Sequence, residues 1–163
     1  MSRIRALFLD RDGVINVDHG YVGRIEDFRF VDGILDFIAA AQRKGYLPIV
    51  VTNQSGIGRG YYGREDFERL TAWMVERMRD HGIAIDRSQV FSCPHAPEEG
   101  CSCRKPEPGM FAEAAKRFHI DMANSWMIGD KESDIEAARR AGVGHRLRVE
   151  KNTPIDRKVL DEL

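Results

Sequence analysis

Short apolar runs alternate along the chain with longer amphipathic segments. Five runs have the length and apolar content of a β-strand, and they cover residues 5–9, 46–52, 89–93, 125–129 and 143–149. The run from Tyr46 to Thr52 is apolar almost throughout, which is typical of a strand buried on both faces of a parallel sheet. The pattern therefore predicts five strands.

Four segments between these runs carry apolar residues at spacings of three and four, the period of an α-helix. They cover residues 33–44, 65–80, 109–119 and 132–141. Gly45 and Gly82 follow the first two, and glycine commonly ends helices. This alternation predicts an α/β fold, doubly wound around a mostly parallel sheet. With 163 residues and no linker-like shift in composition, we expect one domain over residues 1–163.

Polar segments rich in glycine or proline follow four of the predicted strands. In open α/β sheets, ligands bind outside the carboxyl ends of the strands, so these segments are expected to converge. They are DRDG (residues 10–13), TNQSG (52–56), the loop that runs to RKPEPG (93–109) and GDKESD (129–134).

Charge and composition narrow the range of partners. The chain is 42% hydrophobic and 31% charged, with a net charge of −1, which argues against a broad face for nucleic acid or anionic lipid. The apolar run near the N-terminus is too short for a signal peptide or a membrane span. We therefore expect a cytoplasmic protein that acts on a small anion and binds neither nucleic acid nor membrane. Nothing in the sequence demands more than a monomer.

Two carboxylates, Asp10 and Asp12, follow the first predicted strand and precede Gly13. Adjacent carboxylates repel unless a cation joins them, and Mg²⁺ prefers oxygen ligands. Asp10, the backbone carbonyl at Asp12 and a third carboxylate such as Asp130 would form a suitable magnesium site. Taken alone, the motif fits a strand-ending turn equally well, because Asp and Gly are common turn residues.

Further polar residues at the other strand ends change that balance. Thr52 and Asn53 offer a hydroxyl and an amide, Lys105 offers a positive charge, and Asp130 and Asp134 follow the fourth strand. Each alone is explained as well by a strand end, a surface lysine or a helix cap. Together they supply what phosphoryl transfer requires, namely a nucleophile, a metal site, a cation, hydrogen-bond donors and an acid-base group.

These motifs, LFLDRDG, VVTNQSG, the lysine of RKPEPG and MIGDKESD, resemble in order and position the four motifs of the haloacid dehalogenase superfamily of phosphatases. The resemblance implies that Asp10 is the nucleophile that forms an aspartyl-phosphate and that Asp12 is the general acid and base. It also implies that Thr52 and Lys105 stabilise the transferring phosphoryl group, with Asp134 outside the magnesium ligands. The short spacings between the motifs predict an enzyme without a cap domain.

All three cysteines and a histidine lie in one loop, residues 93–103. Cys93, His95, Cys101 and Cys103 have the spacing C-x-H-x5-C-x-C, which supplies the four ligands of a closed, structural zinc site. A catalytic zinc ion would need an open position, which four protein ligands do not leave. Two alternatives are an ordinary loop and a redox pair, although C-x-C lacks the helix-start arrangement that activates a thiol.

The zinc loop followed by RKP resembles the group of histidinol-phosphate and heptose-bisphosphate phosphatases, and the segments NVDHGYV and TNQSGIGRG favour the heptose enzymes. This resemblance implies removal of the 7-phosphate of a heptose 1,7-bisphosphate, with histidinol phosphate as the alternative substrate. A zinc-stapled binding protein without turnover is the alternative from another class. The residues that the resemblance assigns to substrate binding are Asp18, His19, Gly20, Tyr21, Thr52, Asn53, Gln54, Ser55, Arg104, Lys105 and Lys131.

Two further features concern the substrate and the end of the chain. Arg104 suits the phosphate that stays on a bisphosphate sugar, and Arg59 is a second possible contact. The segment after residue 149 is shorter than the strand or helix found at this point in the superfamily, which leaves a C-terminal contribution to the site open.

Overall fold

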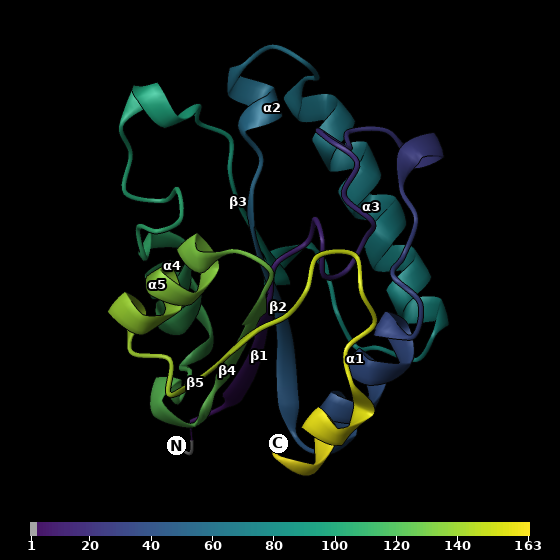
Figure 1. The fold of residues 1–163 in the computed structure, drawn as a ribbon, viewed down its shortest axis with the longest axis vertical. Helices are drawn as coiled ribbons and strands as arrows, with labels where there is room; N and C mark the ends of the chain where they lie inside the picture. Colours follow the sequence, from purple (N-terminus) through teal and green to yellow (C-terminus); the bar gives the residue numbers. More distant parts are fainter. Residues whose placement is uncertain (1–2) are drawn as a thin grey trace.

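The computed structural model describes residues 3–163, and its centre is a sheet of five parallel strands (Figure 1). The strand order is β3-β2-β1-β4-β5, so the order reverses between β1 and β4. Every neighbouring pair is parallel. The strands are β1 (Arg5–Leu9), β2 (Tyr46–Asn53), β3 (Val90–Cys93), β4 (Trp126–Gly129) and β5 (His145–Arg148). The predicted doubly wound α/β fold is confirmed, and β5 is shorter than the predicted run at residues 143–149.

Helices cover both faces of the sheet. Figure 1 shows α4 and α5 on one side and α1 and α3 on the other. The helices are α1 (Ile34–Arg43), α2 (Ser55–Gly58), α3 (Arg64–Asp80), α4 (Gly109–Phe118) and α5 (Glu132–Ala141). Four of them match the predicted segments, whereas α2 is a single turn and too short to show a helical period.

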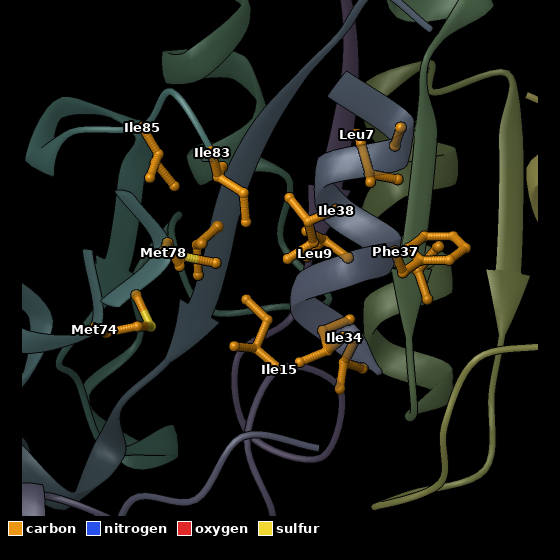
Figure 2. Packing of buried hydrophobic residues seen from close by; sticks show 14 of the residues in the cluster. Leu7, Leu9, Ile15, Ile34, Phe37, Ile38, Met74, Met78, Ile83 and Ile85 are labelled. Carbon is orange, nitrogen blue, oxygen red and sulfur yellow. The ribbon is translucent and has the colours of Figure 1, made fainter. Parts of the chain in front are cut away.

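The alternation of side chains along β1 explains why this strand is apolar throughout. Leu7 and Leu9 belong to the core under α1 and α3, while Ala6 and Phe8 belong to the core under α4 and α5. Successive residues of a strand point to opposite faces, so a strand covered on both faces needs apolar residues at every position. Figure 2 shows Leu7 and Leu9 beside Ile34, Phe37 and Ile38 of α1, with Met74 and Met78 of α3 in the same core.

The C-terminal segment packs back onto the domain. A 3₁₀ helix, Arg157–Asp161, buries Val159 and Leu160 in the core shared with α1. Lys44, which follows α1, donates a hydrogen bond to the carbonyl of Leu160. The short C-terminus is thus part of the fold.

No extra domain interrupts the described residues. Between β1 and β2 lie only a 3₁₀ turn (Ile25–Asp27) and α1, and between β2 and β3 lie α2, α3 and a second 3₁₀ turn (Arg87–Gln89). The expected capless arrangement is confirmed for residues 3–163. Within the same residues, no helix combines the length and the apolar character needed to cross a membrane.

Candidate functional site

A cavity of about 520 Å³ opens at the carboxyl ends of the strands. The residues that line it come from the segments after β1, β2, β3 and β4, as the sequence predicts for a doubly wound sheet. The lining includes most of the predicted site residues: Asp10, Asp12, Asp18, Gly20, Tyr21, Asn53, Gln54, Ser55, Arg59, Arg104, Lys105 and Lys131.

A buried ion-pair cluster joins the ends of three strands. Lys105 Nζ lies 2.9 Å from Asp10 Oδ1 and 2.6 Å from Asp134 Oδ1, and it donates to the carbonyl of Val51 at 2.9 Å. Lys105 is only 3% exposed, Asp10 6% and Asp134 1%. A single lysine therefore links two carboxylates and the backbone of β2, which fixes Asp10 at the floor of the cavity.

The environment shifts the pKa values of this cluster. Burial raises the pKa of Asp10 well above its ordinary value; Lys105 opposes the rise, and the neighbouring Asp134 adds to it. Burial alone would lower the pKa of Lys105, but the carboxylates of Asp10 and Asp134 outweigh it and raise that pKa. The lysine thus stays charged, while Asp10 needs further positive charge nearby to remain ionised.

A third buried carboxylate, Asp130, completes a candidate metal centre. Oxygen atoms of Asp10, Asp130 and Asp134 all lie within 4.8 Å of one another. Asp130 Oδ1 is buried and has no hydrogen-bond partner among residues 3–163. Burial raises the pKa of Asp130 and Asp134 adds to the rise, while Asp10 and Lys131 oppose it. An unpartnered carboxylate oxygen beside other hard oxygen donors is the donor set that suits Mg²⁺.

Asp134 and Gly13 support this cluster in different ways. Asp134 Oδ2 accepts hydrogen bonds from the backbone N–H groups of Asp130 and Lys131, both at 3.1 Å, so Asp134 is fully used without a metal. Gly13 has φ +94°, and a Cβ atom there would lie 2.5 Å from Asp130 Oδ2. Only glycine leaves room for the third carboxylate at this point.

Four hydrogen bonds fix the carboxylate of Asp12, which lies outside the three-carboxylate cluster. Its Oδ1 accepts from Arg11 Nε at 3.1 Å, from Arg11 Nη2 at 2.8 Å and from Asn16 Nδ2 at 3.0 Å. Its Oδ2 accepts from Gln54 Nε2 at 2.9 Å. The Asp12 side chain is thus held by Arg11, Asn16 and Gln54, and its roles in metal binding and acid-base chemistry stay predictions.

Three of the residues predicted for catalysis, substrate binding or magnesium binding do not line the cavity: Asp130, Thr52 and His19. Thr52 is completely buried at the end of β2, and its Oγ1 accepts a hydrogen bond from Gln54 Nε2 at 2.9 Å. His19 is exposed, and its Nε2 lies 2.9 Å from the carbonyl oxygen of Asp27. Their predicted roles in phosphoryl stabilisation and substrate binding therefore stay predictions.

Three residues of the site were not predicted from the sequence. They are Tyr62, which contacts Gln54, and Arg11 and Asn16, which donate to Asp12. Tyr62 lines the cavity, and its hydroxyl donates to Gln54 Oε1. Burial, together with the nearby Asp12, raises the pKa of Tyr62 to about 12, against the effect of Arg11. The hydroxyl thus keeps its proton at neutral pH. The partners of these three residues lie only one to eight residues away in the chain, but no regular spacing marks them as site residues.

The C-terminal segment supports the loop that carries Asp18. Asn152 Oδ1 accepts from the N–H of Asp18 at 2.7 Å, and Asn152 Nδ2 donates to its carbonyl at 3.1 Å. The N–H of Asn152 donates to the carbonyl of Gly13 at 2.9 Å. One asparagine therefore joins the Asp18 loop to the turn after β1.

Positive charge surrounds the mouth of the cavity. Arg104 Nη1 is buried and has no hydrogen-bond partner among the described residues. Arg59 is exposed, and its Nε donates to Ser55 Oγ at 3.4 Å. Lys131, which follows β4, is also exposed. These groups face the same cavity as Asp10 and would attract a second anionic group of a ligand.

The zinc-loop residues converge as their spacing predicts. Ligand atoms of Cys93, His95, Cys101 and Cys103 all lie within 4.8 Å of one another, and the three cysteines are free. Cys93 and Cys103 each have their sulfur 3.3 Å from His95 Nδ1. Two of the three sulfur–sulfur distances are 3.5 Å, near the roughly 3.8 Å that a tetrahedral zinc ion with Zn–S bonds of about 2.3 Å requires, whereas the Cys93–Cys103 distance is shorter, at 2.7 Å.

Thiol chemistry and packing in this loop also suit a metal. Burial raises the pKa of Cys93, whereas in Cys101 the effect of burial is outweighed by the N–H of Arg104 and the neighbouring thiols, which lower the pKa to about 7. The end of the loop is tied to β2, because the side chain of Asn53 accepts from the N–H of Lys105 at 3.0 Å and donates to its carbonyl at 3.3 Å. The cysteine cluster therefore lies directly beside the cations of the cavity.

Comparisons with known proteins place this geometry in a family. A family model described as HAD-hydrolase-like matches residues 102–147. The D-glycero-beta-D-manno-heptose-1,7-bisphosphate 7-phosphatase of Vibrio cholerae serotype O1 is 51% identical over 157 residues, which cover 92% of this chain and 83% of that protein.

Solved structures agree with the sequence comparison. The crystal structure of a HAD-like protein from Mesorhizobium loti superposes with a TM-score of 0.84 at 35% identity, covering 98% of this chain and 84% of that one. The D,D-heptose 1,7-bisphosphate phosphatase from B. bronchiseptica, complexed with magnesium and phosphate, has a TM-score of 0.81 at 34% identity, covering 87% and 79%. The chain belongs to the family of D-glycero-D-manno-heptose-1,7-bisphosphate 7-phosphatases within the HAD-like hydrolases.

Proposed function

We propose that this protein hydrolyses the 7-phosphate of D-glycero-β-D-manno-heptose 1,7-bisphosphate and leaves the sugar 1-phosphate. The observation that carries the proposal is the buried Asp10–Lys105–Asp134 cluster beside the unpartnered Asp130. The 51% identity to the Vibrio enzyme supports the choice of substrate.

Asp10 is the nucleophile in this proposal. A carboxylate oxygen of Asp10 attacks the phosphorus atom of the 7-phosphate, and the bond from phosphorus to the C7 oxygen breaks. Asp12 gives its proton to the departing alkoxide, so the sugar leaves as an alcohol. Asp12 then takes a proton from water, which attacks the aspartyl-phosphate, releases inorganic phosphate and restores Asp10.

Lys105 has two tasks in this scheme. Its ammonium group keeps Asp10 oriented through the 2.9 Å contact and supplies positive charge where the phosphoryl group transfers. Asp134 holds the lysine in place from the other side at 2.6 Å. The cation therefore acts from a fixed position, and no reorganisation is needed during the reaction.

Magnesium fits the neighbouring carboxylates of Asp10 and Asp130 described above. Asp10, Asp130 and the backbone carbonyl at Asp12 would hold it, and a bound Mg²⁺ supplies charge that neutralises phosphate oxygens and keeps Asp10 ionised. Gly13 leaves the space that Asp130 needs for this contact. The relative from B. bronchiseptica, whose crystal structure contains magnesium and phosphate, supports the assignment.

The phosphate that stays on the sugar binds at the mouth of the cavity. Arg104 and Arg59 lie there, and Arg104 has a buried N–H group still free to donate. Asp18 offers oxygen acceptors for sugar hydroxyls from the opposite loop. In the absence of a cap domain, the bisphosphate itself fills the open cavity.

Zinc has a structural part in the proposal. Cys93, His95, Cys101 and Cys103 provide all four ligands, so no position is open for substrate or water. The loop that they hold carries Arg104 and Lys105 into the cavity. Clustered free thiols need a reducing compartment, which supports action in the cytoplasm, and we propose a monomer that acts on a small molecule.

Parallel kinetics test the substrate. With Mg²⁺ present, kcat/KM should be higher for the heptose 1,7-bisphosphate than for histidinol phosphate. A preference for histidinol phosphate would make the protein a histidinol-phosphatase instead. If Mg²⁺ supported no phosphatase activity at all in a well-folded protein, a non-catalytic binding role would replace the enzyme.

Trapping experiments test the mechanism. Asp10→Asn should form no phosphoenzyme in rapid acid-quench labelling, while Asp12→Asn should form it slowly and retain it, because the general base is missing. Asp32→Asn, at an exposed position after the first loop, serves as the matched control. Near-normal turnover in Asp10→Asn would refute the nucleophile assignment.

A further inference from the structure

The general acid of the proposed reaction has its two oxygen atoms in different surroundings. Asp12 Oδ1 is occupied by three donors from Arg11 and Asn16. Asp12 Oδ2 has a single partner in the structure, Gln54 Nε2 at 2.9 Å. Gln54 Nε2 is therefore the donor that acts directly on Oδ2, the oxygen that Arg11 and Asn16 do not hold.

An amide has one donating end and one accepting end, so its orientation matters. Gln54 is 2% exposed, and its Nε2 points to Asp12 Oδ2 and to Thr52 Oγ1, both at 2.9 Å. A carboxylate only accepts hydrogen bonds, so the Nε2 end must face it. The oxygen end of the amide then lies on the other side and needs a donor, because buried polar atoms are costly when unpaired.

Tyr62 is that donor. Its hydroxyl donates a hydrogen bond to Gln54 Oε1. The ring lies between the loop at Gly23 and helix α2, since a Cβ atom at Gly23 would lie 2.6 Å from it and a Cβ atom at Gly56 2.3 Å from it. Two glycines thus let the ring come close enough for the hydroxyl to reach the amide.

The geometry points to Tyr62 as a positioning residue: its hydroxyl fixes the orientation of the Gln54 amide, which in turn aims Asp12 Oδ2 at the leaving oxygen of the substrate. Tyr62 touches neither the phosphoryl group nor the metal ligands in this scheme. The inference rests on the proposed role of Asp12 as the general acid, and it assigns a task that the known motifs do not contain.

A comparison of leaving groups tests this inference. p-Nitrophenolate leaves without a proton, whereas a sugar alkoxide needs one, so only the sugar substrate depends on a well-placed acid. kcat/KM reports the steps up to phosphoryl transfer to Asp10 and excludes the later hydrolysis. In Tyr62→Phe, kcat/KM for the sugar bisphosphate should fall by about tenfold, while kcat/KM for p-nitrophenyl phosphate should stay within about twofold.

Two further variants sharpen the result. Tyr61→Phe, at the exposed neighbouring tyrosine, should leave both values unchanged. In a Gln54→Leu background the additional Tyr62→Phe change should cost less than about twofold, because a residue that acts through another shows no separate effect once that residue is gone. Equal losses with both substrates in Tyr62→Phe, or no loss with either, would overturn the inference.

The outcome is separable from that of the proposed function. A wild-type protein that hydrolyses p-nitrophenyl phosphate but not the heptose bisphosphate would refute the substrate assignment alone. The comparison of leaving groups would then be made with histidinol phosphate, whose leaving group is also an alkoxide. A selective loss there would still support the role of Tyr62, and an unselective one would still reject it.

Discussion

Lys105 is the buried cation on which the site depends, and Lys105→Met removes its charge while keeping most of its length. In the wild type, Lys105 lies 2.9 Å from Asp10 and 2.6 Å from Asp134 and is 3% exposed. Removing one partner of a buried ion pair costs about 3–5 kcal/mol because the other charge stays buried without compensation. Since two carboxylates lose their partner here, we expect a loss at the upper end of that range.

The assay is thermal and urea unfolding without added Mg²⁺, so that no magnesium replaces the lysine and the zinc proposed for the loop stays bound. A loss of about 3–5 kcal/mol lowers Tm by roughly 6–20 °C in a domain of this size. Lys131→Met, at an exposed lysine in the same cavity, is the control and should change stability by less than about 0.5 kcal/mol.

The pH dependence gives a second, independent measure. The raised pKa of Asp10 means that the folded protein binds more protons than the unfolded chain above the ordinary value of 3.8. Stability from this group therefore falls as the pH rises through that window. Without Lys105 the pKa of Asp10 rises further, so the stability lost in Lys105→Met should be larger at pH 8 than at pH 5. A loss below about 1 kcal/mol at pH 8, or one that does not grow with pH, would refute the electrostatic account.

Three more substitutions probe the surroundings of the site. Gly13→Ala places a Cβ atom 2.5 Å from Asp130 Oδ2 at φ +94°, and the Mg²⁺ concentration for half-maximal activity should rise by about tenfold. Cys101→Ala should remove the bound zinc seen by metal analysis and raise KM for the bisphosphate, because the loop no longer holds its cations in place. Asn152→Ala loses two hydrogen bonds to the backbone of residue 18, so KM should rise by about tenfold with kcat unchanged.

Each of these changes has a matched control and an opposing outcome. Gly60→Ala also has a positive φ, +78°, but nothing lies within 4 Å of its Cβ atom, so it tests strain without the collision. Ser102→Ala, between Cys101 and Cys103, is the control for Cys101→Ala. Thr153→Ala, at the next residue after Asn152, is the control for Asn152→Ala. Unchanged metal dependence in Gly13→Ala, unchanged kinetics in zinc-free Cys101→Ala, or a pure kcat effect in Asn152→Ala would contradict the respective argument.

The fold was predictable wherever burial imposes a regular period. β1 runs over Arg5–Leu9 and α5 over Glu132–Ala141, as their apolar patterns predict. The four strand-end motifs converge because a doubly wound sheet brings these ends together, and the four zinc-loop ligands converge because they lie close in sequence. Such features depend on local pattern and on topology, both of which a sequence displays.

The rest depends on contacts between distant segments that leave no local pattern. Asn152 reaches the backbone of Asp18 from 134 positions away, and nothing around residue 152 indicates this. Tyr62 reaches Gln54 only because Gly23 and Gly56 leave space for its ring. A sequence shows where the reactive groups come together, but the residues that orient them are set by packing.

The charges in the cavity indicate that metal and phosphate bind together. The acids that line it are Asp10, Asp12, Asp18 and Asp134, and the bases are Arg59, Arg104, Lys105 and Lys131. These lining charges balance; Asp130 behind them adds one negative charge, and Arg11 and Lys151, which pair with Asp12 and Asp18 from outside the lining, add two positive ones. A phosphate dianion alone would add two uncompensated negative charges to the site, and Mg²⁺ alone would add two positive ones. Since the two ligands neutralise each other, each should raise the affinity for the other, and by linkage the two effects must be equal. Titrating Mg²⁺ with and without inorganic phosphate measures this coupling, and equal Mg²⁺ affinities in the two titrations would exclude it.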